Sequence, residues 1–163
     1  LEGVDIRLEQ TPGSAAARLV DTPTGMAIRS GGEGEAYARR IENLLKRMAR
    51  ERLVHHTGVH CRALNLKAPR VGIGDPKSRW GSCTPGRGSI RYSWRLILAP
   101  PEILDYVAAH EVAHLVHADH SPAFWGVVHQ LIGDHRPYRS WLRAHGAAVI
   151  ANSPQDIVGL LER

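Results

Sequence analysis

A His-Glu-x-x-His motif, formed by His110, Glu111 and His114, is the part of the sequence best suited to chemistry. Residues four apart on a helix lie one turn apart on the same face, so the two imidazoles can bind one small cation. Glu111 projects about 100° away around the helix axis, where it can reach a water bound to that cation. This is the position of the general base in a zinc peptidase. The spacing therefore predicts a hydrolytic metal site with two His ligands and a Glu base.

Apolar residues surround the motif on nearly every side, which predicts a buried helix. Buried imidazole and carboxylate groups need partners, and a metal ion supplies them. The alternative is a solvent-facing stripe of His and Glu on an ordinary core helix. The flanking residues favour the metal site, and they are Ile103, Leu104, Val107, Ala108, Val112, Leu115 and Val116.

A catalytic zinc ion takes three protein ligands and leaves one position for water, so a third ligand must come from outside the motif. His117 would lie on the same helix, and three ligands strung along one axis cannot converge on one ion. His120 becomes available if the helix ends near His117 or Ala118 and the chain turns back. The other candidates are His129, Asp134, His135 and His145.

Two known arrangements of the third ligand are disfavoured. Glu162 is the only Glu after Glu111, which argues against a ligating Glu on a later helix. The metzincin motif has a His at the spacing of His120, but it has Gly where this chain has His117, and it requires a downstream Met. Both methionines lie upstream of the motif, at Met26 and Met48.

The composition is that of a soluble globular protein. The 163 residues are 43% hydrophobic and 23% charged, which fits a single domain over residues 1–163. No run approaches the roughly 18 apolar residues of a membrane span, and no signal peptide is recognisable. Cys61 and Cys83 are too few for a disulfide framework and are interpreted as small buried residues. We expect a cytoplasmic protein without membrane contact, monomeric by default. The first residue is Leu, which is consistent with a longer natural N-terminus.

The chain is basic, with a net charge of +5 and a pI of about 9.7. This charge permits contact with nucleic acid without requiring it. The basic residues are spread along the chain and do not alternate with aromatic residues as in single-strand binding surfaces. A solvated basic surface is the favoured interpretation, and nucleic acid is a candidate partner.

The N-terminal half is predicted to contain a hairpin and a long helix. Residues 1–15 look irregular, whereas 18–28 resemble two short strands joined by a turn at 22–25. Apolar residues recur at helical spacing over 35–56, and Gly58 would end this helix. We expect the amphipathic helix to serve as a scaffold.

A strand hairpin is predicted immediately before the metal helix. Residues 64–73 form a strand region interrupted at Pro69, 78–83 are extended, and 89–94 alternate as a strand. A turn over 84–88 joins the last two. The metal helix is expected over 101–117. The later helices are expected over 122–132 (capped by Ser121), 137–144 (closed by Gly146) and, more weakly, 157–161.

Four spaced motifs occur in a fixed order in the second half of the chain. They are Ser78-Arg79-Trp80-Gly81-Ser82-Cys83, Trp94-Arg95-Leu96-Ile97-Leu98-Ala99-Pro100-Pro101, His110-Glu111-x-x-His114 and His120-Ser121-x-x-Phe124-Trp125. Together they resemble the YgjP-like predicted metal-dependent hydrolases, a bacterial zincin family similar to the SprT and WLM metallopeptidases. The resemblance is strong over about 64–146 and weak before it.

The resemblance implies an α+β, zincin-like metallopeptidase fold, in which a small, mostly antiparallel sheet packs against the long N-terminal helix and the HExxH helix. It also implies His120 as the third ligand, Zn²⁺ as the cofactor, and peptidase activity on a peptide or protein. It supplies no particular substrate.

The expected reaction is metal-assisted hydrolysis of a peptide bond, with Glu111 taking a proton from the water and passing it to the leaving amine. The strand at 90–94 is expected to present an edge to an extended peptide. A donor must also stabilise the oxyanion. For His117 a role at the helix end or in orienting a ligand is equally favoured, and for Tyr138 packing is favoured. The candidate donors are Arg79, His117, Tyr138 and Arg139.

Two other functions stay open. One is a zinc-containing module that binds nucleic acid or a nucleoprotein with little or no hydrolysis, suggested by the basic charge and by the likeness to SprT proteins, which work at DNA. The other is hydrolysis of a non-peptide amide.

Overall fold

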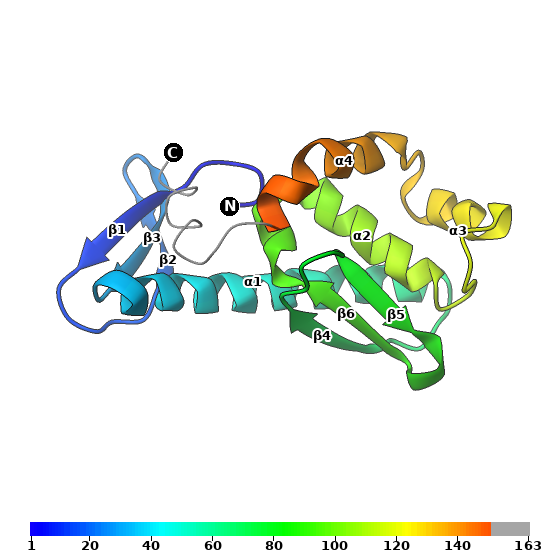
Figure 1. Ribbon diagram of the computed structural model, residues 1–163, viewed down its shortest axis with the longest axis horizontal. Coiled ribbons are helices and arrows are strands. Elements are labelled where there is room, and N and C mark those ends of the chain that lie inside the picture. The colour runs from blue at the N-terminus through cyan, green and yellow to red at the C-terminus, as the bar shows by residue number, and fades with distance from the viewer. Residues whose placement is uncertain (151–163) are drawn as a thin grey trace.

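A computed structural model describes residues 1–150, in which two small sheets and three helices are arranged along one long helix (Figure 1). The strands are β1 (Arg7–Thr11), β2 (Arg18–Thr22), β3 (Gly25–Gly31), β4 (Arg70–Gly74), β5 (Gly81–Thr84) and β6 (Ser89–Ser93). The α-helices are α1 (Gly34–Ala63), α2 (Pro101–Ala113), α3 (Pro122–Ile132) and α4 (Arg136–Ile150), and two 3-10 helices are η1 (Pro85–Arg87) and η2 (Trp94–Leu98). The expected α+β class is confirmed.

The N-terminal sheet contains the predicted hairpin and one strand that the sequence pattern missed. Strands β2 and β3 pair antiparallel across the predicted turn. Residues expected to be irregular include β1, which pairs parallel with β3. The pattern of β1 is weak because only Leu8 of the strand packs against the core. Strand β1 is held in place by its pairing with β3 and by Glu9, whose carboxylate accepts hydrogen bonds from Arg7 and Arg29.

Helix α1 is longer than predicted and runs past Gly58 to Ala63. A glycine inside a helix costs about 1 kcal/mol relative to alanine, which burial of the following turn outweighs. His60 and Cys61 lie in that turn and are buried. The helix ends where Asn65 takes a left-handed conformation (φ 55°), a common helix terminator.

The second sheet lies against α1 and α2 and has the strand order β4-β6-β5 (Figure 1). Strands β5 and β6 form the predicted antiparallel hairpin, and Gly88 (φ 56°) provides the left-handed residue of its turn. Strand β4 begins immediately after Pro69 and pairs parallel with β6. The expectation of a mostly antiparallel sheet was wrong, because each sheet has one parallel and one antiparallel pair of strands. The parallel partners are brought together by connections that a local pattern does not reveal.

Helices α3 and α4 follow α2: α3 lies near the C-terminal end of α2, whereas α4 runs back along α2 toward its N-terminal end and also contacts η2 (Figure 1). Helix α3 begins as predicted, with the Ser121 hydroxyl accepting a hydrogen bond from the Phe124 N–H. Helix α4 does not end at Gly146, which is buried against the Trp80 ring; a Cβ there would lie 3.2 Å from Trp80 Cζ2. This glycine is therefore explained by packing. The helix expected at 157–161 lies outside the described residues.

The core lies between α1, α2 and the second sheet. Tyr92 on β6 faces α1, where its hydroxyl lies 2.8 Å from Thr57 Oγ1. Both cysteines are free thiols, with Cys61 buried as expected and Cys83 half-buried. Within residues 1–150, no helix is both long enough and apolar enough to cross a membrane.

Candidate metal centre

The side chains of His110, His114 and His120 meet at the C-terminal end of α2. One ligand nitrogen from each lies within 4.8 Å of the other two. The Nε2 atoms of His110 and His120 are 3.3 Å apart. The structure thus brings together the two His of the motif and the His that the family resemblance favoured as third ligand.

The early end of α2 makes this convergence possible. The helix was expected to continue to His117, but it ends at Ala113, and the chain tightens through hydrogen bonds from Leu115 N–H to Val112 and from Val116 N–H to Ala113. The carbonyl of His117 then lies 3.0 Å from Nδ1 of His114. A proton on that Nδ1 leaves Nε2 of His114 with its lone pair free for a metal.

His117 therefore contacts the site through its backbone, which fits the helix-end interpretation of this residue. The other candidate ligands are not in the cluster. Within residues 1–150, neither group of three side chains with metal-ligand spacing contains His129, Asp134, His135 or His145.

Phe124 on α3 supports all three imidazoles, a role that the sequence analysis missed. Its fully buried ring stacks on His114, with centroids 4.5 Å apart. It meets His110 and His120 edge-on, at 4.9 and 5.0 Å. The signal was the position of Phe124 in the fourth motif, four residues after His120.

The environment of His110 favours a neutral imidazole. Burial, together with the neighbouring His114 and His120, lowers the pKa of His110 to about 3. Neutral imidazole is the form that binds a metal ion. The Nδ1 atom of His110 is buried and has no hydrogen-bond partner among the described residues.

Glu111 is buried beside the cluster, with 6% of its surface exposed. Burial raises the pKa of this carboxyl to about 7, against the opposing charge of Arg79. A carboxylate with a pKa near neutrality is suited to accept and return a proton at physiological pH. The space for its side chain is created by Gly81 on β5, where an added Cβ would lie 2.9 Å from Glu111 Cγ and 3.0 Å from Oε1.

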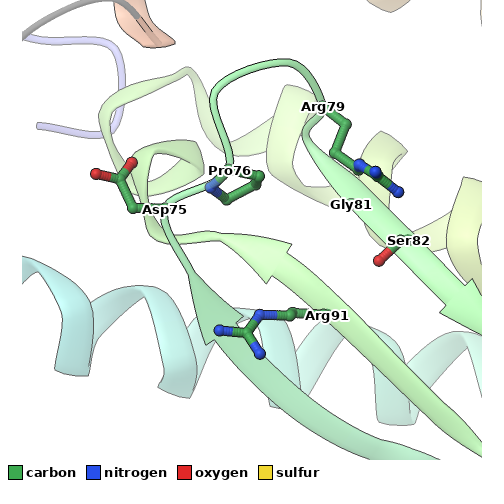
Figure 2. A pocket seen from close by; sticks show the side chains of 6 residues that line it. All are labelled: Asp75, Pro76, Arg79, Gly81, Ser82 and Arg91. Carbon is green, nitrogen blue, oxygen red and sulfur yellow. The ribbon is translucent and has the colours of Figure 1, made fainter.

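The oxyanion-donor candidates lie in different surroundings. Tyr138 stacks on Tyr106, with centroids 5.8 Å apart, which favours the packing role. The Arg139 guanidinium lies 5.4 Å from the Trp125 ring centroid, and its charge contributes to lowering the pKa of His110. Arg79 is close enough to Glu111 to affect the pKa of its carboxyl. Arg139 thus lies on α4 and Arg79 in the segment before β5 (Figure 2), so the two candidate donors come from different elements.

The strand expected to present an edge beside the site was misassigned. Strand β6, which contains 89–93, is central and pairs on both sides. The edge strand next to α2 is β5, which carries Gly81. The alternation in β6 shows one buried face and does not reveal its place in the sheet.

A second group with metal-ligand spacing consists of His56 and His60 on α1 and Asp105 on α2. Oδ1 of Asp105 lies 2.8 Å from His56 Nδ1 and 2.6 Å from His60 Nε2. Although partial burial favours the neutral acid, these two hydrogen bonds hold the pKa of Asp105 below its ordinary value. This group could hold a metal ion, but its polar atoms also satisfy one another without one.

Comparison with known proteins identifies the family. The YgjP-like, metallopeptidase domain family matches residues 1–145. The chain belongs to this family. The match includes the N-terminal part, where the motifs gave only a weak resemblance. Family membership makes the YgjP-like chain a metal-dependent peptidase that acts on peptides or proteins.

A solved structure supports the zincin-like fold. The crystal structure of the metallopeptidase zymogen of Pyrococcus abyssi abylysin matches with a TM-score of 0.51 and 22% sequence identity, and the match covers 58% of this chain and 92% of that chain. A search of curated proteins finds no match to the chain.

Proposed function

We propose that the protein is a zinc peptidase in which His110, His114 and His120 hold the ion and Glu111 is the general base. The observation that carries the proposal is the convergence of three imidazole nitrogens within 4.8 Å, beside a buried carboxylate. Three nitrogen donors with a fourth position left open are the ligand set of a catalytic zinc site.

The residues present fit zinc in charge as well as in number. The low pKa of His110 keeps its imidazole neutral, and the His117 carbonyl favours the Nδ1–H form of His114. When bound, zinc would polarise the scissile carbonyl and lower the pKa of water.

The chain's own contribution to the reaction centres on Glu111. Its carboxylate accepts a proton from the attacking water and later donates that proton to the nitrogen of the leaving amine. The C–N bond then breaks and the amine product can leave. Burial keeps the carboxyl pKa near neutrality, so both transfers are feasible at the same pH. Arg79 and Arg139 remain the cationic candidates for stabilising the oxyanion.

The ligand assignment is tested by metal content. His120→Ala should lower bound zinc from about one ion per chain to a small fraction of that, because two ligands on one helix hold zinc weakly. His117→Ala is the matched control: it should retain most of the zinc, because His117 contacts the site through its carbonyl. Elemental analysis of both purified variants shows whether His120 or His117 is the third ligand. Loss of zinc only in His117→Ala would reassign that ligand to His117.

The role of Glu111 is tested separately. Glu111→Gln preserves the shape of the side chain but removes the proton acceptor, so zinc content should be unchanged and peptide hydrolysis should fall by about 10²–10⁴-fold. Hydrolysis at the native rate by this variant would exclude Glu111 as the base.

A further inference from the structure

The group of His56, His60 and Asp105 shares no residue with the three-histidine cluster and joins two different helices. His56 and His60 lie one turn apart on α1, and Asp105 faces them from α2. Oδ1 of Asp105 lies 2.8 Å from Nδ1 of His56 and 2.6 Å from Nε2 of His60. The structure thus brings two imidazole nitrogens and a carboxylate oxygen together, and all three are atoms that zinc accepts as ligands.

Packing fixes the turn of α1 that carries the two histidines. His60 is buried, with 4% of its surface exposed. Thr57 lies between the two histidines in the sequence and is buried as well, with its Oγ1 2.8 Å from the hydroxyl of Tyr92 on β6. This contact attaches the same turn to the second sheet. Little conformational freedom is therefore left for an ion to remove from the two imidazoles.

The charge and the exposure of the group suit a cation. Although partial burial favours the neutral acid, the hydrogen bonds from His56 and His60 hold the pKa of Asp105 below its ordinary value. Its carboxyl is therefore ionised at neutral pH, which is the form that binds a metal ion. The side chains of His56 and Asp105 are 27% and 33% exposed. An ion can thus enter from solvent, and water can complete its coordination.

The spacing of the ligand atoms indicates a weaker site than the three-histidine cluster. Ligand atoms about 2.0–2.1 Å from a tetrahedral zinc ion lie roughly 3.3 Å from one another. The Nε2 atoms of His110 and His120 already have this separation, at 3.3 Å. In the second group, shared protons hold the ligand atoms at 2.6 and 2.8 Å. An ion must break two hydrogen bonds and spread these ligands before it can bind.

We propose that His56, His60 and Asp105 bind a second zinc ion when zinc is in excess, and that this ion fastens α1 to α2. The ion replaces two hydrogen bonds with bonds to a metal at a point five residues before the HExxH motif. Its role is structural. The inference goes beyond the proposed peptidase function, because it concerns metal stoichiometry and stability and not the chemistry at Glu111.

Equilibrium dialysis of the native protein against increasing zinc at neutral pH measures both sites. One ion per chain should bind tightly. A second ion should bind about 10–100-fold more weakly, because two hydrogen bonds are lost when it enters. Saturation at one ion per chain under a large excess of zinc would overturn the proposal and leave the group as a hydrogen-bonded contact.

His56→Ala removes one ligand at a partly exposed position. It should lose the second ion and keep the first, and retention of the first ion shows that the variant is folded. Asp105→Asn should also lose the second ion, since an amide is a poor replacement for a carboxylate. His129→Ala is the matched control, because His129 is exposed on α3 and belongs to neither ligand group. A second ion that persists in His56→Ala, or that is lost from His129→Ala as well, would overturn the assignment.

The structural role is tested by urea unfolding with the first site filled. Further zinc should raise the unfolding midpoint of the native protein and of His129→Ala, because an ion that binds only the folded state stabilises it. The midpoint of His56→Ala should not rise. An equal rise in all three proteins would contradict the link between α1 and α2.

His120→Ala separates this inference from the proposed function. It should lose the tight ion and keep the weak one. Retention of the tight ion by His120→Ala would overturn the ligand set of the catalytic site, whereas loss of only the weak ion in this variant would overturn the second site.

Discussion

Glu111 and Gly81 form a pair in which one residue provides the carboxylate and the other provides the space for it. The motif places Glu111 on α2, but only the absence of a side chain at Gly81 lets the carboxylate lie buried against β5. The position of the base therefore depends on a residue thirty positions earlier in the sequence.

Gly81→Ala should displace the Glu111 side chain, because the new Cβ would lie 2.9 Å from its Cγ. We expect turnover to fall about tenfold to a hundredfold, since small misplacements of catalytic groups have effects of that size. Overpacking should cost about 1–3 kcal/mol of stability, and zinc content should stay unchanged. Steady-state kinetics, urea unfolding and elemental analysis measure these three quantities.

Gly72→Ala is the control for that substitution. A Cβ at Gly72 meets nothing closer than 3.7 Å, so this variant should keep native turnover. Equal turnover in the two variants would show that Gly81 does not position the base.

Phe124 should affect zinc affinity without contacting the ion, because its ring packs on all three imidazoles. Phe124→Leu keeps the site apolar but removes the stacked surface. We expect zinc affinity to fall about 10–100-fold, the usual effect of losing a residue that orients metal ligands. Competition with a chelator measures this affinity. Val128→Ala, at an equally buried site one turn later in α3, should lose stability but keep zinc affinity. Equal affinity losses in both variants would indicate a general packing effect.

Among the elements, α1 and α2 are joined by the group of His56, His60 and Asp105. The two His lie one turn apart on α1 and reach the same carboxylate oxygen on α2. This contact attaches α2 to α1 at Asp105, five residues before the metal motif begins at His110. The sequence analysis missed it because the partners lie more than forty positions apart.

Asp105→Asn should destabilise the fold by about 1–3 kcal/mol at neutral pH, since it weakens two partly buried hydrogen bonds. Because the folded-state pKa of Asp105 lies below its ordinary value, its stabilisation is present above about pH 4 and is lost as the pH falls further. The difference from the native protein should therefore shrink in acid. Urea unfolding at pH 7 and near pH 3 measures it.

Glu42→Gln is the control, because it breaks a surface ion pair with Lys46. It should change the free energy of unfolding by less than about 1 kcal/mol. A difference for Asp105→Asn that stays constant from neutral to acid pH would contradict the assigned role of the Asp105 charge.

Local sequence patterns predicted the helices and the hairpins well. They failed where contacts between residues far apart in the sequence determine a helix end or the position of a strand in its sheet. Gly58 and Gly146 look like helix ends, yet both lie inside helices because packing outweighs their low propensity. The convergence of His110, His114 and His120 could be anticipated because all three lie within eleven residues. The edge position of β5 was not, since it depends on the parallel pairing of β4 with β6.

At the scale of the whole molecule, α1 contacts both sheets and α2, and so fixes the metal helix relative to strand β5 (Figure 1). Gly81 on that strand leaves the space in which the Glu111 side chain lies. Whether the surface also binds nucleic acid is measured by the salt dependence of DNA binding.

The central claim is tested most directly by a crystal structure of the protein grown with zinc, with anomalous data collected at the zinc edge. One strong peak should lie between His110, His114 and His120, at about 2.0–2.1 Å from a nitrogen of each. A peak only at His56, His60 and Asp105, or three imidazoles pointing apart despite ample zinc, would contradict it.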